Sequence, residues 1–279
     1  MLRHGHAALV HTDLRAVRVT GRDARAWLHD LVTADIASLA PGELRPSLLL
    51  TPTGRIRAAF AVAADHDGFV LLQGDDQSDV GAMLSPYVLS AAVAIRPDGR
   101  TFASVPGADP RTAIAGALWR PSLVPVREPI GELVAVDADG LEALRRRLAT
   151  AGIAEASVAD AERLRVEDGV PRFPVDLDDA SLPAEAGWED RIDTAKGCFL
   201  GQESVAKVRN LGHPPRLVRP FATEEPVAVG DPIAASGETV GTVTSAVTTA
   251  AGGRCIGRIR WEARDATLAT AAGVALQPA

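Results

Sequence analysis

The sequence is poor in cysteine, in aromatic residues and in clustered positive charge. Two cysteines, Cys198 and Cys255, occur in 279 residues, which is too few for a disulfide framework and is typical of a reducing compartment. Aromatic residues make up 4% of the chain, so we expect cores built from valine, leucine, isoleucine and alanine. The formal net charge is −7 and no basic run exceeds Arg145–Arg147, which argues against direct nucleic-acid binding.

Long apolar runs are also missing. None approaches the ~20 residues that a membrane-spanning helix needs. Residues 1–17 alternate polar and apolar positions and lack the continuous apolar segment of a signal peptide. We therefore expect a soluble, cytoplasmic protein with no membrane partner. The histidines at positions 4, 6 and 11 lie in this N-terminus, which we expect to be frayed rather than a metal site.

Strands and helices alternate in the first 210 residues, but without a regular β-α-β rhythm, which favours an α+β fold. The pattern predicts strands at 16–19, 47–50, 56–63, 69–73, 92–95, 101–104 and 133–136. Helices are predicted after Asp23, from Asp75 or Asp76 to Leu84, from Gly140 to Ala149, and from Ser157 to Val166. A hairpin turn is predicted at Pro97-Asp98-Gly99.

The pattern changes at Gly212–Pro215, which predicts a domain boundary. Beyond it, short β-like runs at 217–221, 239–247, 255–260 and 273–276 are separated by turns rich in glycine, proline and aspartate. We expect residues 1–210 to form a mixed-sheet body with two subdomains, and residues 211–279 to form an all-β barrel.

The stretch 194–210, TAKGCFLGQESVAKVRN, carries the strongest chemical signal. Cys198 lies on a glycine-flanked loop between Lys196 and a helix predicted to begin at Gln202. A nearby ammonium and a helix N-terminus both favour the reactive thiolate over the thiol. The alternative is that Cys198 is a small buried apolar residue beside Phe199.

A second candidate lies at the end of the helix predicted through Val166. Glu167 could face a pocket, where a carboxylate can accept two parallel N–H bonds such as those of the amino-pyrimidinone edge of a pterin. The alternative is a solvated helix end capped by Gly169. Trp188 could form a flat apolar wall of the same pocket, or pack in an ordinary core.

Five segments together resemble one family. They are Ala26–Asp35, Leu50–Ile56, Arg165–Asp176, Leu182–Trp188 and Lys196–Glu203. In this order they are similar to the YgfZ-type folate-binding proteins, relatives of the glycine-cleavage T-protein. The specific signal is K-G-C-F-L-G-Q-E, because the hallmark of that family reads K-G-C-[FY]-x-G-Q-E.

The resemblance implies a tetrahydrofolate-binding protein that supports iron–sulfur enzymes, with indirect effects on tRNA modification. Its partners would be folate and iron–sulfur assembly or client proteins. The functional motif would consist of Cys198 and Lys196 with Gly197, Gly201, Gln202 and Glu203. The folate would contact Glu167, Arg165, Trp188 and Gln202. No metal site is implied on the monomer, because one cysteine cannot hold a cluster, although Cys198 could serve as a shared ligand.

One departure from the T-protein bears on catalysis. The strand after Gly54 carries Ala58 and Ala59 where that enzyme has acidic residues that serve the folate chemistry. Three hypotheses follow: a folate-dependent iron–sulfur accessory protein, an active folate-dependent aminomethyl- or methyltransferase, and an interaction module with a vestigial pocket. The alanines favour the first over the second.

Overall fold

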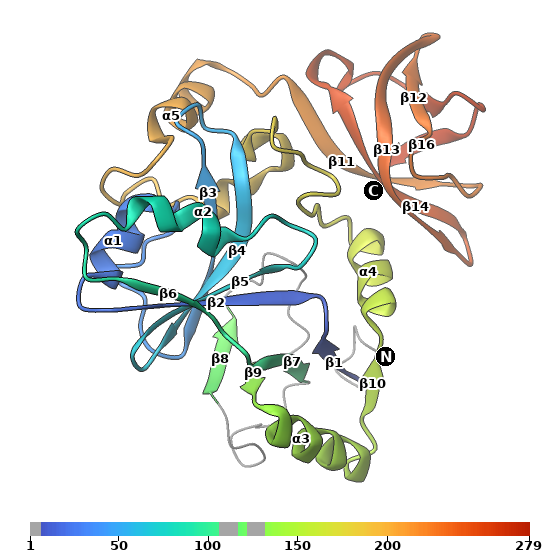
Figure 1. Cartoon of the computed structure of the whole chain (residues 1–279). Helices are drawn as coiled ribbons and strands as arrows, with labels where there is room; N and C mark the ends of the chain where they lie inside the picture. Colours follow the sequence, from blue (N-terminus) through green and yellow to red (C-terminus); the bar gives the residue numbers. More distant parts are fainter. Residues whose placement is uncertain (1–6, 106–116, 122–131) are drawn as a thin grey trace. The chain divides into compact units, whose positions relative to one another are not determined.

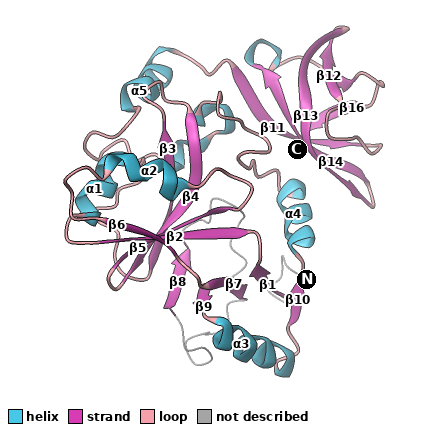
Figure 2. Ribbon diagram, in the orientation of Figure 1, coloured by secondary structure: helices cyan, strands magenta, loops and turns pink. Residues whose placement is uncertain are grey.

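The computed structural model describes residues 7–105, 117–121 and 132–279 (Figure 1). The chain forms two compact units whose segments interleave along the sequence. The first contains residues up to Leu49, Ala58–Ala161 and Arg191–Leu200. The second contains Leu50–Arg57, Glu162–Asp190 and Gly201–Ala279. Mixed strands, helices and a closed C-terminal barrel confirm the predicted α+β class (Figure 2).

A ten-stranded sheet forms the basis of the first unit, in the order β10-β1-β7-β9-β8-β3-β4-β5-β2-β6. Its strands are β1 (Ala7–His11), β2 (Leu14–Thr20), β3 (Glu43–Leu50), β4 (Ile56–Asp65), β5 (Gly68–Gly74), β6 (Ala94–Pro97), β7 (Thr101–Val105), β8 (Ala117–Pro121), β9 (Glu132–Val136) and β10 (Ala154–Ala156). Its helices are α1 (Ala24–Leu31), α2 (Val80–Leu84), the 3-10 turn η2 (Ser85–Tyr87) and α3 (Ala138–Thr150).

Both faces of the central strands are buried. Every second residue of β4 from Ala58 to Ala64 joins a core that includes Leu28 of α1 and Leu84 of α2. Ala61 and Ala63 join a core on the opposite face, with residues of β7 and β9. This two-sided burial explains why β4 is a continuous apolar run rather than an alternating one.

The second unit joins a helical segment to a barrel. Its helices are α4 (Val158–Glu167), which belongs to this unit from Glu162 on, the 3-10 turns η4 (Pro183–Ala186) and η5 (Trp188–Arg191, to Asp190), α5 (Gln202–Leu211) and the 3-10 turn η6 (Trp261–Ala263). Six strands close into the barrel: β11 (Arg216–Thr223), β12 (Pro232–Ala235), β13 (Glu238–Thr249), β14 (Gly252–Arg260), β15 (Leu268–Thr270) and β16 (Ala275–Pro278). Phe221, Ile233 and Ile259 are among the residues that fill it.

Two local predictions were wrong. Strands β6 and β7 exist, but β6 pairs with β2 and β7 pairs with β1 and β9, so Pro97-Asp98-Gly99 does not turn a hairpin. Helix α2 begins after Asp79, which accepts hydrogen bonds from the backbone N–H groups of Gly81 and Ala82. It therefore begins later than the prediction at Asp75 or Asp76.

The N-terminal prediction was also wrong where the structure describes it. His11 lies in the buried strand β1, and its Nε2 is 2.7 Å from the Ser104 hydroxyl. His4 and His6 lie outside the described residues. None of the described helices is long and apolar enough to cross a membrane.

Candidate functional site: the Cys198 loop and the α4 segment

The Cys198 loop follows η5 and contains residues 192–200 of the first unit. Cys198 itself is exposed, so the interpretation of this residue as a buried core thiol does not hold. Its neighbour Phe199 is buried and anchors the loop. The Lys196 ammonium lies 5.4 Å from the centre of the Phe199 ring, within the range of a cation–π contact.

Lys196 fixes the loop to the end of helix α1. Its ammonium donates hydrogen bonds to the carbonyl oxygens of His29, of Val32 at 2.6 Å and of Ala34 at 3.0 Å. These carbonyls at and beyond the helix C-terminus are not bonded within the helix, and a cation there is favoured. Burial lowers the pKa of Lys196 to about 8, against the opposing charges of Asp35, Asp30 and Asp193.

Two further residues support the loop, and the sequence did not point to their roles. The Asp193 carboxylate accepts bonds from the backbone N–H groups of Ala195 and Lys196, at 2.8 and 3.0 Å. Thr33 accepts the Asp193 N–H on its carbonyl, and its buried hydroxyl donates to the Arg191 carbonyl at 2.7 Å. One feature of the sequence could have indicated this role: the polar residue Thr33 follows directly after the apolar face of the predicted helix.

The two glycines of the motif have different surroundings. A Cβ on Gly197 would meet nothing within 4 Å, and its backbone has no left-handed φ. Gly201 has φ +86°, and a Cβ there would lie 2.5 Å from the Thr51 carbonyl oxygen. Gly201 is therefore required by the fold, whereas Gly197 is not.

Gly201 also sets the start of helix α5. It is the N-cap in a left-handed conformation, and no side chain caps the helix. Gln202 is half-buried in the first turn and Glu203 is exposed. The turn at Gly54 packs closely on the same helix, since a Cβ on Gly54 would lie 2.7 Å from the Ser204 Cβ.

Arg165 is fully buried within the second unit. Its Nε and Nη2 donate to Glu162, and Nη1 donates to the Val170 carbonyl and to Asp176. The remaining Nη2 proton is directed at the Ser245 hydroxyl, 2.7 Å away. Asp176 also accepts bonds from the hydroxyls of Thr244 and Ser245.

This network uses all five N–H groups of Arg165 within the part of the chain that the structure describes. It ties α4 and the segment after it to strand β13 of the barrel. The geometry supports a structural role for Arg165. A contact from Arg165 to folate stays a prediction from the resemblance.

Glu167 ends helix α4 and is partly exposed. Its carboxylate accepts a hydrogen bond from Arg163 Nε at 2.9 Å, one helical turn earlier. Trp188 is buried at 4% exposure, which fits core packing as well as a covered pocket wall. Glu167 and Trp188 belong to the second unit, and Lys196 and Cys198 to the first. Their common cavity therefore stays a prediction.

The alanines that mark the departure from the T-protein are buried in β4. Ala58 and Ala59 are 0% and 4% exposed. The backbone N–H and carbonyl of Ala59 are both bonded to the side-chain amide of Gln77, at 3.0 and 2.9 Å. This position of the strand presents neither charge nor a side-chain acceptor.

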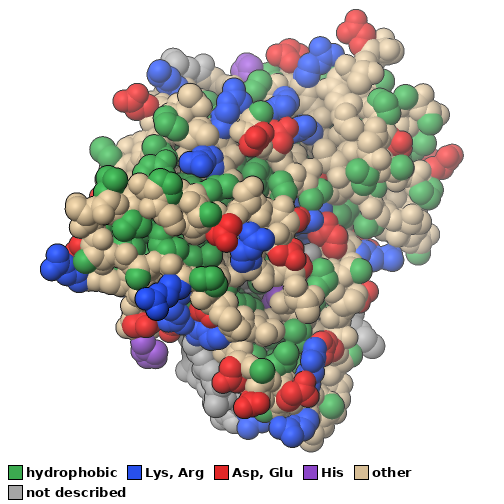
Figure 3. Space-filling model, viewed as in Figure 1, with side chains coloured by type: hydrophobic (Ala, Val, Ile, Leu, Met, Phe, Trp, Pro, Cys, Tyr) green, Lys and Arg blue, Asp and Glu red, His purple; other side chains and the backbone are tan. Residues whose placement is uncertain are grey.

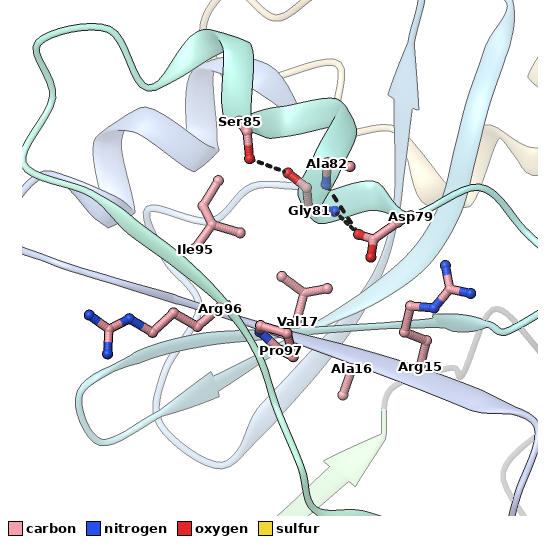
Figure 4. A pocket seen from close by; sticks show the side chains of 10 residues that line it. All are labelled: Arg15, Ala16, Val17, Asp79, Gly81, Ala82, Ser85, Ile95, Arg96 and Pro97. Carbon is pink, nitrogen blue, oxygen red and sulfur yellow. Dashed lines mark hydrogen bonds between the residues drawn. The ribbon is translucent and has the colours of Figure 1, made fainter.

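Apolar side chains gather over the region of α1 and α2 in the view of Figure 3. A hollow of about 420 Å³ lies between α2 and the strands β2 and β6, lined in part by Val17, Gly81 and Ile95 (Figure 4). It contains no residue of the predicted site. Among the described residues, no group of three or more histidines, cysteines, aspartates or glutamates could hold a metal ion.

Comparisons with known proteins agree with the resemblance. No family model matches the chain. A tRNA-modifying protein YgfZ of Vibrio vulnificus (strain YJ016) is 26% identical over 250 residues, covering 81% of this chain and 76% of that protein. An aminomethyltransferase of Streptomyces avermitilis is also 26% identical, covering 91% of this chain and 78% of the enzyme.

The fold is shared with a solved structure. The glycine cleavage system aminomethyltransferase T of Bartonella henselae superimposes with a TM-score of 0.83, covering 99% of this chain and 87% of that one. Its sequence identity is 17%, so this likeness shows the fold alone. The resemblance predicted from the motifs is confirmed: the chain is similar to YgfZ-type proteins and has the fold of a glycine-cleavage aminomethyltransferase.

Proposed function

We propose that this chain is a tetrahydrofolate-binding accessory protein for iron–sulfur enzymes, acting through the Cys198 loop. The observation that carries the proposal is an exposed Cys198 on a loop whose neighbours are fixed: Lys196 by three carbonyls and Phe199 by burial. A thiol held in one place at the surface suits a ligand or nucleophile that meets a partner protein.

Any cluster bound through Cys198 is shared with a partner. The other cysteine, Cys255, is completely buried in the barrel, and burial raises its pKa to about 11. It therefore stays a thiol and is no second ligand. A cluster normally takes four protein ligands, so the partner supplies the others. Effects on tRNA modification follow through client enzymes that carry clusters.

For folate, we propose that Glu167 binds the pterin edge. An ionised carboxylate is an acceptor-only group, and the amino-pyrimidinone edge offers two parallel N–H donors. Glu167 is 25% exposed at a helix end, so its side chain is both held and reachable. Trp188 and Gln202 would complete the contacts, and the folate-binding part would be residues 1–210 with the barrel at 211–279.

The alternative functions differ in what they require. An aminomethyltransferase needs groups that stabilise charge near the reacting folate nitrogens, and the buried alanines Ala58 and Ala59 supply none at the place where the T-protein carries acids. We therefore propose that the chain is not an aminomethyltransferase of that kind. An interaction module with a vestigial pocket would bind no folate.

Folate binding is tested by titrating the purified protein with tetrahydrofolate while following tryptophan fluorescence. Glu167→Ala should weaken binding by about 1.5–3 kcal/mol, the scale of a charge-assisted hydrogen bond. Glu238→Ala, which removes an exposed carboxylate from the barrel, is the matched control and should leave affinity unchanged. No binding to the wild type supports the vestigial module, and unchanged affinity in Glu167→Ala removes that residue from the site.

The thiol is tested separately, by alkylation of the native protein and by complementation with Cys198→Ser. We expect Cys198 to be alkylated in the native protein, because its side chain is exposed, and we expect loss of function in the serine variant. Cys255→Ser should complement if it folds. A native protein whose Cys198 resists alkylation, or a fully functional Cys198→Ser, would falsify the central role of Cys198.

A further inference from the structure

The side chain of His29, in the last turn of helix α1, fixes the segment that follows the helix. Its Nδ1 accepts hydrogen bonds from the backbone N–H groups of Ile36 and Ala37, each at 3.2 Å. Ile36 is completely buried, and its N–H has no other acceptor in the part of the chain that the structure describes. Two N–H donors at one ring nitrogen require a lone pair there, so this imidazole is neutral and carries its proton on Nε2.

The segment 29–37, closed in this way, holds the Cys198 loop. Backbone carbonyls of this segment accept three hydrogen bonds from the Lys196 ammonium. The Thr33 carbonyl accepts a further bond from the Asp193 N–H, at 3.0 Å. All of these bonds reach residues that precede the two amides held by the imidazole. The imidazole therefore closes the part of the chain on which the Cys198 loop rests.

The carboxylate of Asp35 offers the imidazole a second arrangement. Its Oδ1 lies 3.3 Å from His29 Nδ1 and also accepts N–H bonds from Ala37 at 2.9 Å and Ser38 at 3.3 Å. The hydrogen bond from the Ser38 hydroxyl is the main cause that holds the pKa of Asp35 below its usual value, so Asp35 stays ionised. A proton on Nδ1 would make that nitrogen a donor to Asp35 and would leave the Ile36 N–H without its acceptor.

Charged groups of both signs surround the imidazole. They lie on α1, on the segment after it, on β3 and on the Cys198 loop: Asp30, Asp35, Asp193, Arg25, Arg45 and Lys196. Both signs occur, so the clearest difference between the neutral and the charged imidazole lies in the hydrogen bonds at Nδ1. Arg25 also donates to the carbonyls of Ile36 and Ala37, and these bonds do not need the imidazole. The change on protonation is therefore local.

We propose that the neutral imidazole of His29 positions the Cys198 loop, and that protonation of His29 loosens this loop. The imidazole closes the segment 29–37, and that segment holds Lys196 and Asp193, which flank the turn that presents Cys198. The consequence for activity depends on the function proposed above. The movement of the loop can be measured without folate, iron or a partner protein.

The test is amide hydrogen exchange of the full chain, resolved by residue with NMR, at about pH 5 and about pH 8, the range over which histidine changes charge. After correction for the intrinsic pH dependence, the Ile36 amide should exchange faster at the lower pH by about fivefold or more, the scale of one lost hydrogen bond. The amides of Ala195 and Lys196, which bond to the Asp193 carboxylate, should change in the same direction. Amides of strand β14 in the barrel serve as the reference.

Two variants of His29 separate the acceptor from the titration. In His29→Asn, the Oδ1 atom lies as many bonds from Cα as Nδ1 does, accepts hydrogen bonds and does not titrate. This variant should keep the slow exchange at both pH values. His29→Ala has no acceptor and should exchange fast at both. His66→Ala is the matched control, because His66 is an exposed histidine of the same unit, on the turn between β4 and β5. It should behave as the wild type does.

Equal pH dependence in the wild type and in His29→Asn would assign the change to another group and overturn the proposal. Fast exchange of Ile36 in His29→Ala, with Ala195 and Lys196 unchanged, would also overturn it, because the imidazole would then hold only its own segment. If His29→Ala unfolds, the wild type and His29→Asn still decide, since both keep the acceptor. A fully functional Cys198→Ser would contradict the proposed function and leave these exchange rates as they are.

Discussion

Arg165 and Lys196 are cations from two motifs of the same resemblance, and each is held by a different kind of partner. Arg165 is fully buried and faces the carboxylates of Glu162 and Asp176. Lys196 is half-buried, and its three hydrogen-bond acceptors are backbone carbonyls. Carboxylates offset the lost hydration of a buried cation with full charges, whereas carbonyls do so with dipoles.

The two pKa directions reflect this difference. Burial acts to lower the pKa of Arg165, but hydrogen bonding to Glu162 and the charge of Asp176 raise it above its usual value. Burial acts in the same way on Lys196, and there it prevails over the surrounding carboxylates. The α4 segment thus contains an ion-pair network in which Arg165 keeps its charge. The Cys198 loop is held by Lys196, which can lose its proton.

The largest expected effect is on the buried network. Arg165→Met leaves Asp176 without its buried cation and should lower the free energy of unfolding by about 3–5 kcal/mol. Arg163→Ala breaks a partly exposed pair on the same helix and should cost less than ~1 kcal/mol. Urea unfolding of both variants checks this. Equal losses would mean that Arg165 stabilises the fold no more than a surface charge does.

The next largest effect on stability is expected at the two glycines of the motif, Gly201 and Gly197. Gly201→Ala places a Cβ 2.5 Å from the Thr51 carbonyl at φ +86° and should cost about 1–3 kcal/mol. Gly197→Ala meets nothing within 4 Å and should change stability by less than ~0.5 kcal/mol. Thermal unfolding distinguishes them. If Gly197→Ala also abolishes complementation, the space beside Gly197 is needed by a binding partner.

The contacts of Lys196 predict a smaller effect on stability that depends on pH. The pKa of this lysine falls from 10.5 to about 8 on folding, so between those values the unfolded chain binds more protons. The charge therefore opposes folding most below pH 8, and this cost disappears as pH rises towards 10.5. The free energy of unfolding of the wild type minus that of Lys196→Met should increase over this range in urea titrations.

Lys207→Met is the control for that measurement, because Lys207 is exposed on α5. Its difference from the wild type should stay flat with pH. A flat difference for Lys196→Met as well would mean that the ammonium is fully compensated by its carbonyl partners.

The smallest effect on stability is expected at Cys198. Because its side chain is exposed, Cys198→Ser should change the free energy of unfolding by less than ~0.5 kcal/mol. Cys255 provides an internal reference: in the native protein an alkylating reagent should modify Cys198, and Cys255 only after unfolding. Mass spectrometry of labelled peptides checks this, and equal native labelling would contradict the assigned burial.

Local chemistry explains which parts of the fold could be predicted from the sequence. The capping of α4 was predicted because Ser157 and Asp160 bond reciprocally within three residues. Strand β4 was predicted because its apolar run is long and bounded by turns. The predictions that were wrong depended on contacts between residues far apart in the sequence. The sequence near Pro97 is typical of a hairpin, but β6 pairs with β2, whose residues are about 80 positions away.

The features of the candidate site also differ in whether neighbouring residues in the sequence could predict them. The helix beginning at Gln202 follows from its neighbours in sequence. The exposure of Cys198 does not, because the apolar neighbours Phe199 and Leu200 also allowed a buried thiol. The direction of the Lys196 side chain cannot be predicted from its sequence neighbours, because its partners lie at and just beyond the end of α1, more than 160 residues earlier. The burial of Arg165 likewise depends on Asp176 and Ser245, which pattern alone cannot place beside it.

The interleaving of the two units has a consequence for the order of events during synthesis on the ribosome. Residues 50–57 belong to the second unit, where the Ile56 N–H bonds to the Ser181 carbonyl and Gly201 packs on Thr51. The first unit in turn includes Arg191–Leu200. The ten strands of the sheet have all emerged by residue 156, whereas the first unit is complete only after residue 200, so the sheet can pair before Arg191–Leu200 add the Cys198 loop to it.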